Sequence, residues 1–257
     1  MGFVSGTAAD VVEFAAGGYR YLAGVFQYSA GVAAQTGFAI ERARFAQPLP
    51  LREGFAEVEA FLERRGRPPT AFCACELRSP APFTEQGFGE FNRHYVQTLE
   101  RWGLYRDGVN PVARTNVCPV FDPPTVPSLF GFSYTVPSEL RARGTFVISG
   151  GSEAREGRAS YRDSIVRLGD ISLDGLRDKV RCVAAAMEGR LGALGFGWAD
   201  ATFTQAYTVH DIGPLVREEI LARGAARDGL VWHYCRPPVV DIEFEMDVRG
   251  TAVERVI

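Results

Sequence analysis

The stretch VFQYSAGVAA (25–34) returns 120 residues later as TFVISGGSEA (145–154), and this repetition decides how the chain is organised. Ser29 and Ser149 are 120 residues apart, and Arg114 and Arg236 are 122 apart. An offset that barely changes between distant landmarks predicts a duplicated domain. At 257 residues, the chain is long enough for two units that each bury a core of their own.

The elements between these landmarks follow one order in both halves. Helical periodicity predicts helices over 51–66, 88–103, 174–195 and 212–224. Alternating or apolar runs predict strands over 25–34, 70–79, 113–121, 145–154, 199–211 and 235–248. The Pro-rich stretch FDPPTVPSLFGF (121–132) ends the first unit, and SLFGFSYTV (128–136) is expected to be a connecting strand. The predicted domains are therefore residues 1–127 and 128–257.

The composition argues against several classes of partner. The 28 basic and 31 acidic residues are interspersed and give a net charge of −3, so no nucleic-acid surface is expected. No apolar stretch is long enough to span a membrane, and the N-terminus lacks the pattern of a signal peptide. The five cysteines lie mostly in strand or helix patterns, which favours buried, reduced thiols. We expect a soluble cytoplasmic protein.

Cofactor chemistry is also disfavoured. Lys179 is the only lysine, against 27 arginines, and it lies within a helical pattern rather than at a cleft signal. A pyridoxal-phosphate or Schiff-base enzyme needs such a lysine at its site. The three histidines form no metal-ligand cluster, and the chain has no phosphate-binding or dinucleotide-binding glycine motif. We therefore expect neither a metal nor a cofactor.

Each half resembles the reactive-intermediate deaminase family, also called RidA/YjgF. The strings VFQYSAGVA, FGEFNRHY and PVARTNV carry the resemblance in the first half. The strings GYRYLAGVFQYSAGVAA and AFCACELRSPAPFTEQGF look like the two-unit members that deaminate aminomuconates. The resemblance implies an α+β fold of two tandem chorismate-mutase-like units, each a mixed β-sheet backed by two helices. It also implies a homotrimer, or a dimer of trimers, with sites between neighbouring units.

The same resemblance implies a set of site residues. Arg114 and Asn92 match family positions that line the ligand site, and Tyr28 and Ser29 lie at a turn where the family contacts its ligand. Glu243 matches the acidic residue on the family's last strand.

The second half departs from the family pattern after its arginine. Pro237 and Pro238 follow Arg236, where the family usually has Thr or Ser. Either one site was kept and the other lost, or a composite site takes Arg114 from one half and an acid from a neighbouring half.

The implied reaction is hydrolysis of an enamine or imine carboxylic acid with release of ammonia. A guanidinium binds a carboxylate through two parallel hydrogen bonds, which is the role expected of Arg114. A general acid–base must activate water and protonate the leaving amine. Glu76, beside Arg78 on an alternating strand, is the first candidate, and Glu243 is the second. The imine is already electrophilic, so neither a metal nor a lysine is required.

Further candidates share these strands, and each has a structural alternative. Asn116 and Cys118 share a face with Arg114 and are expected to contact the substrate, as is Arg78. Cys118 is also explained by packing, and Glu76 and Arg78 by an ion pair at an interface. The competing functions are a non-catalytic module that binds small carboxylates and a chorismate hydrolase that releases pyruvate.

Overall fold

The computed structural model describes residues 10–139, 144–154 and 160–257. Within these ranges the α-helices are α1 (Leu51–Arg64), α2 (Glu85–Arg101), α3 (Leu173–Ala193) and α4 (Gly213–Leu215). The strands of the first half are β1 (Val11–Phe14), β2 (Tyr19–Leu22), β3 (Gly31–Ala34), β4 (Phe38–Pro50), β5 (Phe72–Arg78) and β6 (Ala113–Pro119). The strands that follow are β7 (Ser128–Pro137), β8 (Phe146–Ser152), β9 (Phe203–Tyr207), β10 (Leu230–His233), β11 (Cys235–Arg236), β12 (Glu245–Gly250) and β13 (Val253–Val256).

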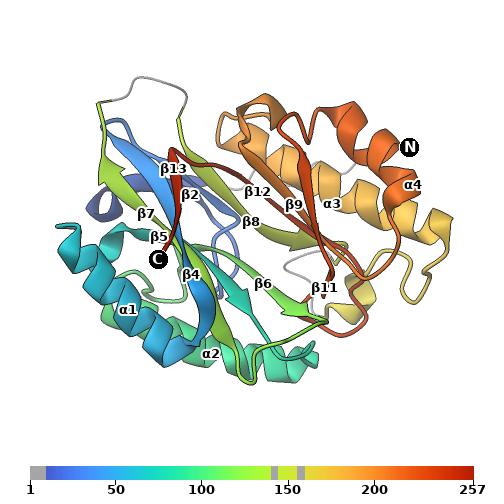
Figure 1. Ribbon diagram of the computed structural model, residues 1–257, viewed down its shortest axis with the longest axis horizontal. Helices are drawn as coiled ribbons and strands as arrows, with labels where there is room; N and C mark the ends of the chain where they lie inside the picture. The colour runs from blue at the N-terminus through green and yellow to red at the C-terminus, as the bar shows by residue number, and fades with distance from the viewer. Residues whose placement is uncertain (1–9, 140–143, 155–159) are drawn as a thin grey trace.

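These strands form two mixed sheets, and the chain is an α+β protein. The first sheet has the order β11-β6-β5-β7-β4-β13, and the second has the order β1-β2-β3-β8-β12-β9-β10. Helices α1 and α2 cover the outer face of the first sheet, while α3 and α4 cover the outer face of the second (Figure 1). The two sheets therefore lie between two layers of helices.

The helices begin and end where side chains and glycines provide caps. The Oγ1 atom of Thr84 accepts a hydrogen bond from the Gly87 amide at the start of α2, and Ser172 caps α3 in the same way. Gly103 and Gly195 follow the C-terminal ends of α2 and α3 with φ of 74° and 83°, a conformation that glycine adopts without strain. Most of the predicted helices begin and end within a few residues of the observed ones.

Each sheet buries an apolar core beneath its helices. The first core is rich in aromatic residues, among them Phe55, Phe72 and Trp102, whose rings contact one another edge to face. The second core joins α3 to β8, β9 and β12. Polar contacts join the faces that the sheets turn toward each other: Thr115 on β6 donates a hydrogen bond to Asp247 on β12 at 2.7 Å.

The sheets do not follow the division expected at residues 127/128. Strand β7 comes after that point but pairs with both β4 and β5, so it is an internal strand of the first sheet rather than a connector. Strands β2 and β3 come before it but extend the second sheet, because β3 pairs with β8.

Three predicted elements were wrong in detail. The strand expected over 25–34 begins as a turn, in which the backbones of Val25 and Tyr28 hydrogen-bond to each other, and only Gly31–Ala34 forms a strand. The helix expected over 212–224 is irregular: α4 is followed by a π-helical segment, Val216–Ile220, and a 3₁₀ turn, Leu221–Arg223. The strand expected over 235–248 is broken into β11 and β12, which lie in different sheets. The two prolines after Arg236 lack backbone N–H donors, which explains the break. No helix among the described residues has the length and apolarity needed to cross a membrane.

Candidate active site

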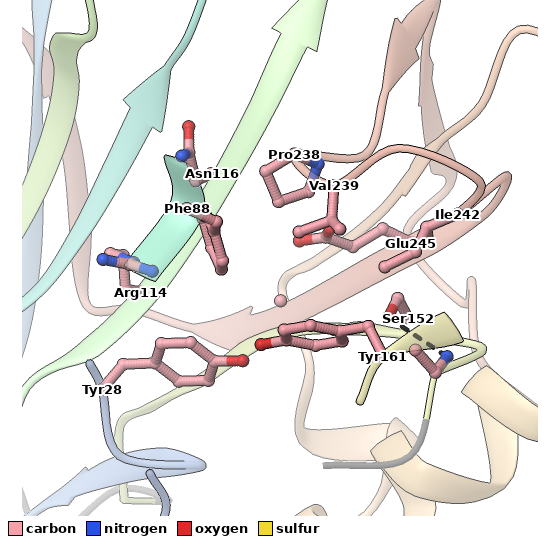
Figure 2. Close-up of a pocket in the computed structure, with 12 residues that line it drawn as sticks. Tyr28, Phe88, Arg114, Asn116, Ser152, Tyr161, Pro238, Val239, Ile242 and Glu245 are labelled. Carbon is pink, nitrogen blue, oxygen red and sulfur yellow. Dashed lines mark hydrogen bonds between the residues drawn. The ribbon is translucent and has the colours of Figure 1, made fainter. Parts of the chain in front are cut away.

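One pocket takes its walls from both halves of the chain. The first half supplies Tyr28, Phe88, Arg114 and Asn116, and the second supplies Gly150, Ser152, Ala154, Tyr161, Pro238, Val239, Ile242 and Glu245. Figure 2 shows Arg114 on one side, Glu245 reaching in from the other, and the hydroxyl groups of Tyr28 and Tyr161 pointing toward each other. The pocket therefore brings a cation and a carboxyl together between apolar and aromatic walls.

Arg114 is a buried cation on β6. Its Nη1 atom donates a hydrogen bond to Oδ1 of Asn92 on α2 at 2.7 Å, and its backbone amide donates to the hydroxyl of Ser149. The guanidinium carbon lies 4.7 Å from the ring centroid of Tyr95 and 5.1 Å from that of Tyr28. Among the described residues these neutral groups hold the side chain in place, which leaves its charge available to an anion.

Glu245 is a buried acid at the start of β12. Its side chain is nearly inaccessible, and burial raises the pKa of its carboxyl well above the usual range. The negative charges of Asp247 and Glu153 raise the pKa further, while Arg114 and Arg190 act in the opposite direction. The carboxyl therefore holds its proton at a higher pH than an ordinary glutamate does.

The backbone at Gly150 makes room for this carboxyl. A Cβ atom at Gly150 would lie 2.1 Å from Oε1 of Glu245, closer than any contact between nonbonded atoms. Glycine at this position therefore allows the close approach of the acid, and any larger residue would displace the Glu245 carboxyl.

Asn116 has one hydrogen-bonding group that the described part of the chain leaves unpaired. Its Oδ1 atom accepts a hydrogen bond from the Ser79 hydroxyl at 2.9 Å, but its buried Nδ2 has no partner among those residues. Asn116 is 3% exposed and lines the pocket. A buried amide donor of this kind is costly unless a ligand or water completes it.

The structure brings several of the predicted site residues together. Tyr28, Arg114 and Asn116 line the pocket, and Asn92 supports Arg114 from behind. Ser29 lies next to the pocket, where its carbonyl accepts a hydrogen bond from the Ser149 hydroxyl at 2.6 Å.

Two other predicted residues lie outside the pocket lining. Arg78 stacks on Phe130, with its guanidinium carbon 4.2 Å from the ring centroid. Cys118 is buried, and burial raises the pKa of its thiol to about 12. The thiolate form that a nucleophilic cysteine needs is therefore scarce at neutral pH.

Glu76 lies in an ion pair between the sheets and does not line the pocket. Arg42 donates two hydrogen bonds to its carboxylate, at 2.5 and 2.8 Å, and both side chains are nearly fully buried. Although burial opposes it, the charges of Arg42 and Arg249 hold the pKa of Glu76 far below the usual range. A carboxylate that stays ionised in this way is a poor proton donor near neutral pH.

Glu243 also lies away from Arg114. It precedes β12, and its Oε2 atom is 2.7 Å from Nε2 of His210. The acid that lines the pocket is two residues farther on. Sequence reasoning missed Glu245, Gly150 and Tyr161, and the run Glu243-Phe244-Glu245 was the only signal for the first of these.

Comparison with known proteins identifies the family. A family model described as 2-aminomuconate deaminase CnbZ matches residues 11–255. The chain belongs to this family. A 2-amino-5-chloromuconate deaminase from Comamonas testosteroni is 59% identical over 249 residues, covering 96% of this chain and 99% of that protein. The CnbZ family member described here is therefore an enzyme that removes an amino group.

A solved structure shows the same fold at low sequence identity. A chorismatase crystal structure matches with a TM-score of 0.53 and 13% identity, covering 90% of this chain and 79% of that one. At this identity the match concerns the fold alone. It agrees with two mixed sheets flanked by helices.

Proposed function

We propose that this protein hydrolyses the enamine or imine form of a 2-aminomuconate-like acid in the pocket between Arg114 and Glu245, releasing ammonia. The observation that carries the proposal is the meeting, in one pocket, of a carboxyl of raised pKa and a cation that has no carboxylate partner among the described residues. The 59% identity to a 2-amino-5-chloromuconate deaminase supports this substrate class.

Arg114 binds the carboxylate next to the nitrogen-bearing carbon. Its fork of N–H donors fits a carboxylate in two parallel hydrogen bonds. Asn92 positions the guanidinium through the bond to Nη1, and the rings around it exclude water. Exclusion of water strengthens the attraction between the guanidinium of Arg114 and the substrate carboxylate.

Glu245 is the general acid–base, in place of Glu76 or Glu243. In its protonated form it donates a proton to the enamine carbon, which leaves an iminium and a carboxylate. The carboxylate then accepts a proton from the water that adds to the iminium carbon. The carboxyl next protonates the nitrogen, ammonia leaves, and the hydroxyl proton returns to Glu245 as the carbonyl forms. One carboxyl therefore serves every proton transfer.

Arg114→Ala tests the assignment of the cation. Loss of two charge-assisted hydrogen bonds is expected to lower kcat/KM for 2-aminomuconate by at least about 100-fold. Arg93→Ala, an exposed arginine on α2, is the matched control and is expected to behave as wild type. Ammonia release is the measurement. Equal activity of the two variants would contradict the role of Arg114, and no ammonia from the wild type would contradict the proposed reaction.

Gly150→Ala tests the position of the acid. The added methyl group meets the flexible end of Glu245, so the fold is expected to survive while the carboxyl is displaced. A displacement on the order of 1 Å lowers kcat roughly 100-fold. Gly189→Ala on α3 is the control, because a Cβ atom there meets nothing within 4 Å. Full activity of Gly150→Ala would show that Glu245 need not occupy its observed position.

We further propose that the two halves are tandem RidA/YjgF-like units. The order β6-β5-β7-β4 in the first sheet matches β10-β9-β12-β8 in the second, with the same relative strand directions. In this correspondence β10 takes the place of β6 and β7 takes the place of β12. Strand β10 contains no arginine and β7 contains no acid. The strand equivalent to that of Arg114 therefore has no arginine, and the strand equivalent to that of Glu245 has no acid, so we expect one working site per chain.

The proposed site is composite within one chain, because Arg114 and Glu245 come from different units. It therefore needs no residue from a neighbouring subunit. A homotrimer or a dimer of trimers remains a prediction from the family resemblance, and light scattering of the purified protein tests it.

A further inference from the structure

We propose that Asn116 is a specificity-determining residue that binds the second carboxylate of a six-carbon dicarboxylic substrate. This inference rests on the proposed function, in which Arg114 holds the first carboxylate. The observation behind it is the buried Nδ2 atom of Asn116, a donor that finds no partner within residues 10–139, 144–154 and 160–257 and belongs to a side chain lining the pocket.

The orientation of the amide is fixed from behind. The Ser79 hydroxyl, itself fully buried, donates to Oδ1 of Asn116, so the oxygen side of the amide is occupied. The nitrogen side keeps its two N–H donors unpaired among the described residues. A carboxylate oxygen is a stronger acceptor than a neutral group, and its charge strengthens the bond.

The backbone spacing of the two residues is of the same order as the length of the substrate. Arg114 and Asn116 are two positions apart on β6, so their backbone positions differ by about 6.7 Å along the strand. Five carbon–carbon bonds of about 1.5 Å each place the terminal carbons of a six-carbon diacid roughly 6 Å apart. The apolar side chains of Phe88, Val239 and Ile242 line the same pocket and suit the carbon chain between the two ends.

The charges around the pocket also suit a second anion. Glu245 is the one carboxyl among the described lining residues, and its raised pKa favours the neutral form. A neutral Glu245 does not repel a dicarboxylate. Asn116 then selects for the second carboxylate without adding a second cation, which would compete with Arg114 for the reacting end.

Binding of two unreactive probes tests the inference. Muconate and sorbate are six-carbon dienes that differ in the second carboxylate, which sorbate lacks. The wild type is expected to bind muconate more tightly in a calorimetric titration. Asn116→Leu is expected to weaken muconate binding by roughly 10- to 100-fold and to leave sorbate binding nearly unchanged.

Two further variants keep the test decisive. Ser79→Ala removes the hydroxyl but retains Nδ2, so it is expected to keep most of the preference for muconate. If Asn116→Leu folds poorly because the Ser79 hydroxyl loses its acceptor, the double variant Ser79→Ala/Asn116→Leu replaces it. A wild type without preference, or an equal loss for both probes, would overturn the inference. Because neither probe reacts, this failure is distinct from failure to release ammonia.

Discussion

Glu245→Gln is expected to lower kcat for ammonia release by roughly 10²- to 10⁴-fold, the range for loss of a general acid–base. Gln has nearly the same shape but cannot transfer a proton. Gln also removes a buried acid that repels Asp247 and Glu153, so the fold is expected to remain intact. Single-turnover kinetics together with circular dichroism separate loss of chemistry from loss of structure.

The pH dependence follows from the raised pKa of Glu245. The first step needs the protonated carboxyl, so kcat/KM of the wild type is expected to fall as pH rises through this pKa. The residual activity of Glu245→Gln should lack this alkaline decline. An identical decline in both proteins would assign it to a different group.

The substitution Glu245→Gln should change stability in the opposite sense to activity. Between the unfolded and the folded pKa of Glu245, the native state binds more protons than the unfolded state, so wild-type stability falls as pH rises through this window. Glu245→Gln lacks this loss and is expected to be more stable than the wild type at alkaline pH. The same pH dependence of stability in both proteins would contradict a raised pKa at Glu245.

Glu243→Gln distinguishes the two neighbouring acids. Glu243 contacts His210 outside the pocket, so its substitution should affect turnover far less than that of Glu245. The reverse order would favour the assignment made from the sequence. Because Glu243 and Glu245 lie only two residues apart and receive the same substitution, a difference in turnover between the two variants reflects the position of the carboxyl.

The regular amphipathic elements could be predicted from the sequence, but the longest strand could not. Helix α1 begins at Leu51, as its periodicity indicates. Strand β4 was missed because Glu41, Arg42 and Arg44 make its sequence read as polar. Arg42 is nevertheless buried, since it pairs with Glu76 across the sheet. A buried ion pair gives no hydrophobic signal, so tertiary contacts decided this strand.

The sequence suggests a repeat, but not the register of the correspondence that we propose. Ser29 and Ser149 match in sequence, yet in the proposed correspondence the strand of the first sheet equivalent to β8 is β4, while Ser29 lies just before β3. Arg236 matches Arg114 in spacing, yet it lies on β11, which pairs with β6 itself. Short similar strings align equally well at several offsets, and only the order of strands selects one.

The cation of the proposed site could be predicted from the sequence, and the proposed acid could not. Arg114 belongs to a motif with a regular strand pattern. The choice between Glu243 and Glu245 depends on where β12 begins. Glu153 contributes to fixing that point, because its carboxylate accepts hydrogen bonds from the backbone amides of Glu243 and Phe244 at 2.7 and 3.1 Å. The contact joins residues 90 positions apart, which no local pattern reveals.

Lys179→Met is expected to destabilise the protein by about 3–5 kcal/mol, the cost of leaving a buried charge without its partner. The Nζ atom of Lys179 lies 3.2 Å from Oε1 of Glu153, and both side chains are fully buried. The lysine also donates to the Val166 carbonyl at 2.8 Å. Chemical denaturation of the two proteins measures the difference.

The pH dependence of unfolding should reveal why Lys179→Met is destabilising. Burial already raises the pKa of Glu153, and loss of Lys179 removes an opposing charge, so this pKa rises further. The destabilisation should therefore be largest at alkaline pH and shrink as pH falls toward the pKa of the unfolded state. Arg181→Met on the same helix removes a half-exposed arginine from the buried carboxylate of Glu219, which keeps Arg177 as a second ion-pair partner at 3.6 Å, so it should change stability less. Equal losses of stability in Lys179→Met and Arg181→Met would show that the buried Lys179–Glu153 pair does not hold the backbone that leads to Glu245.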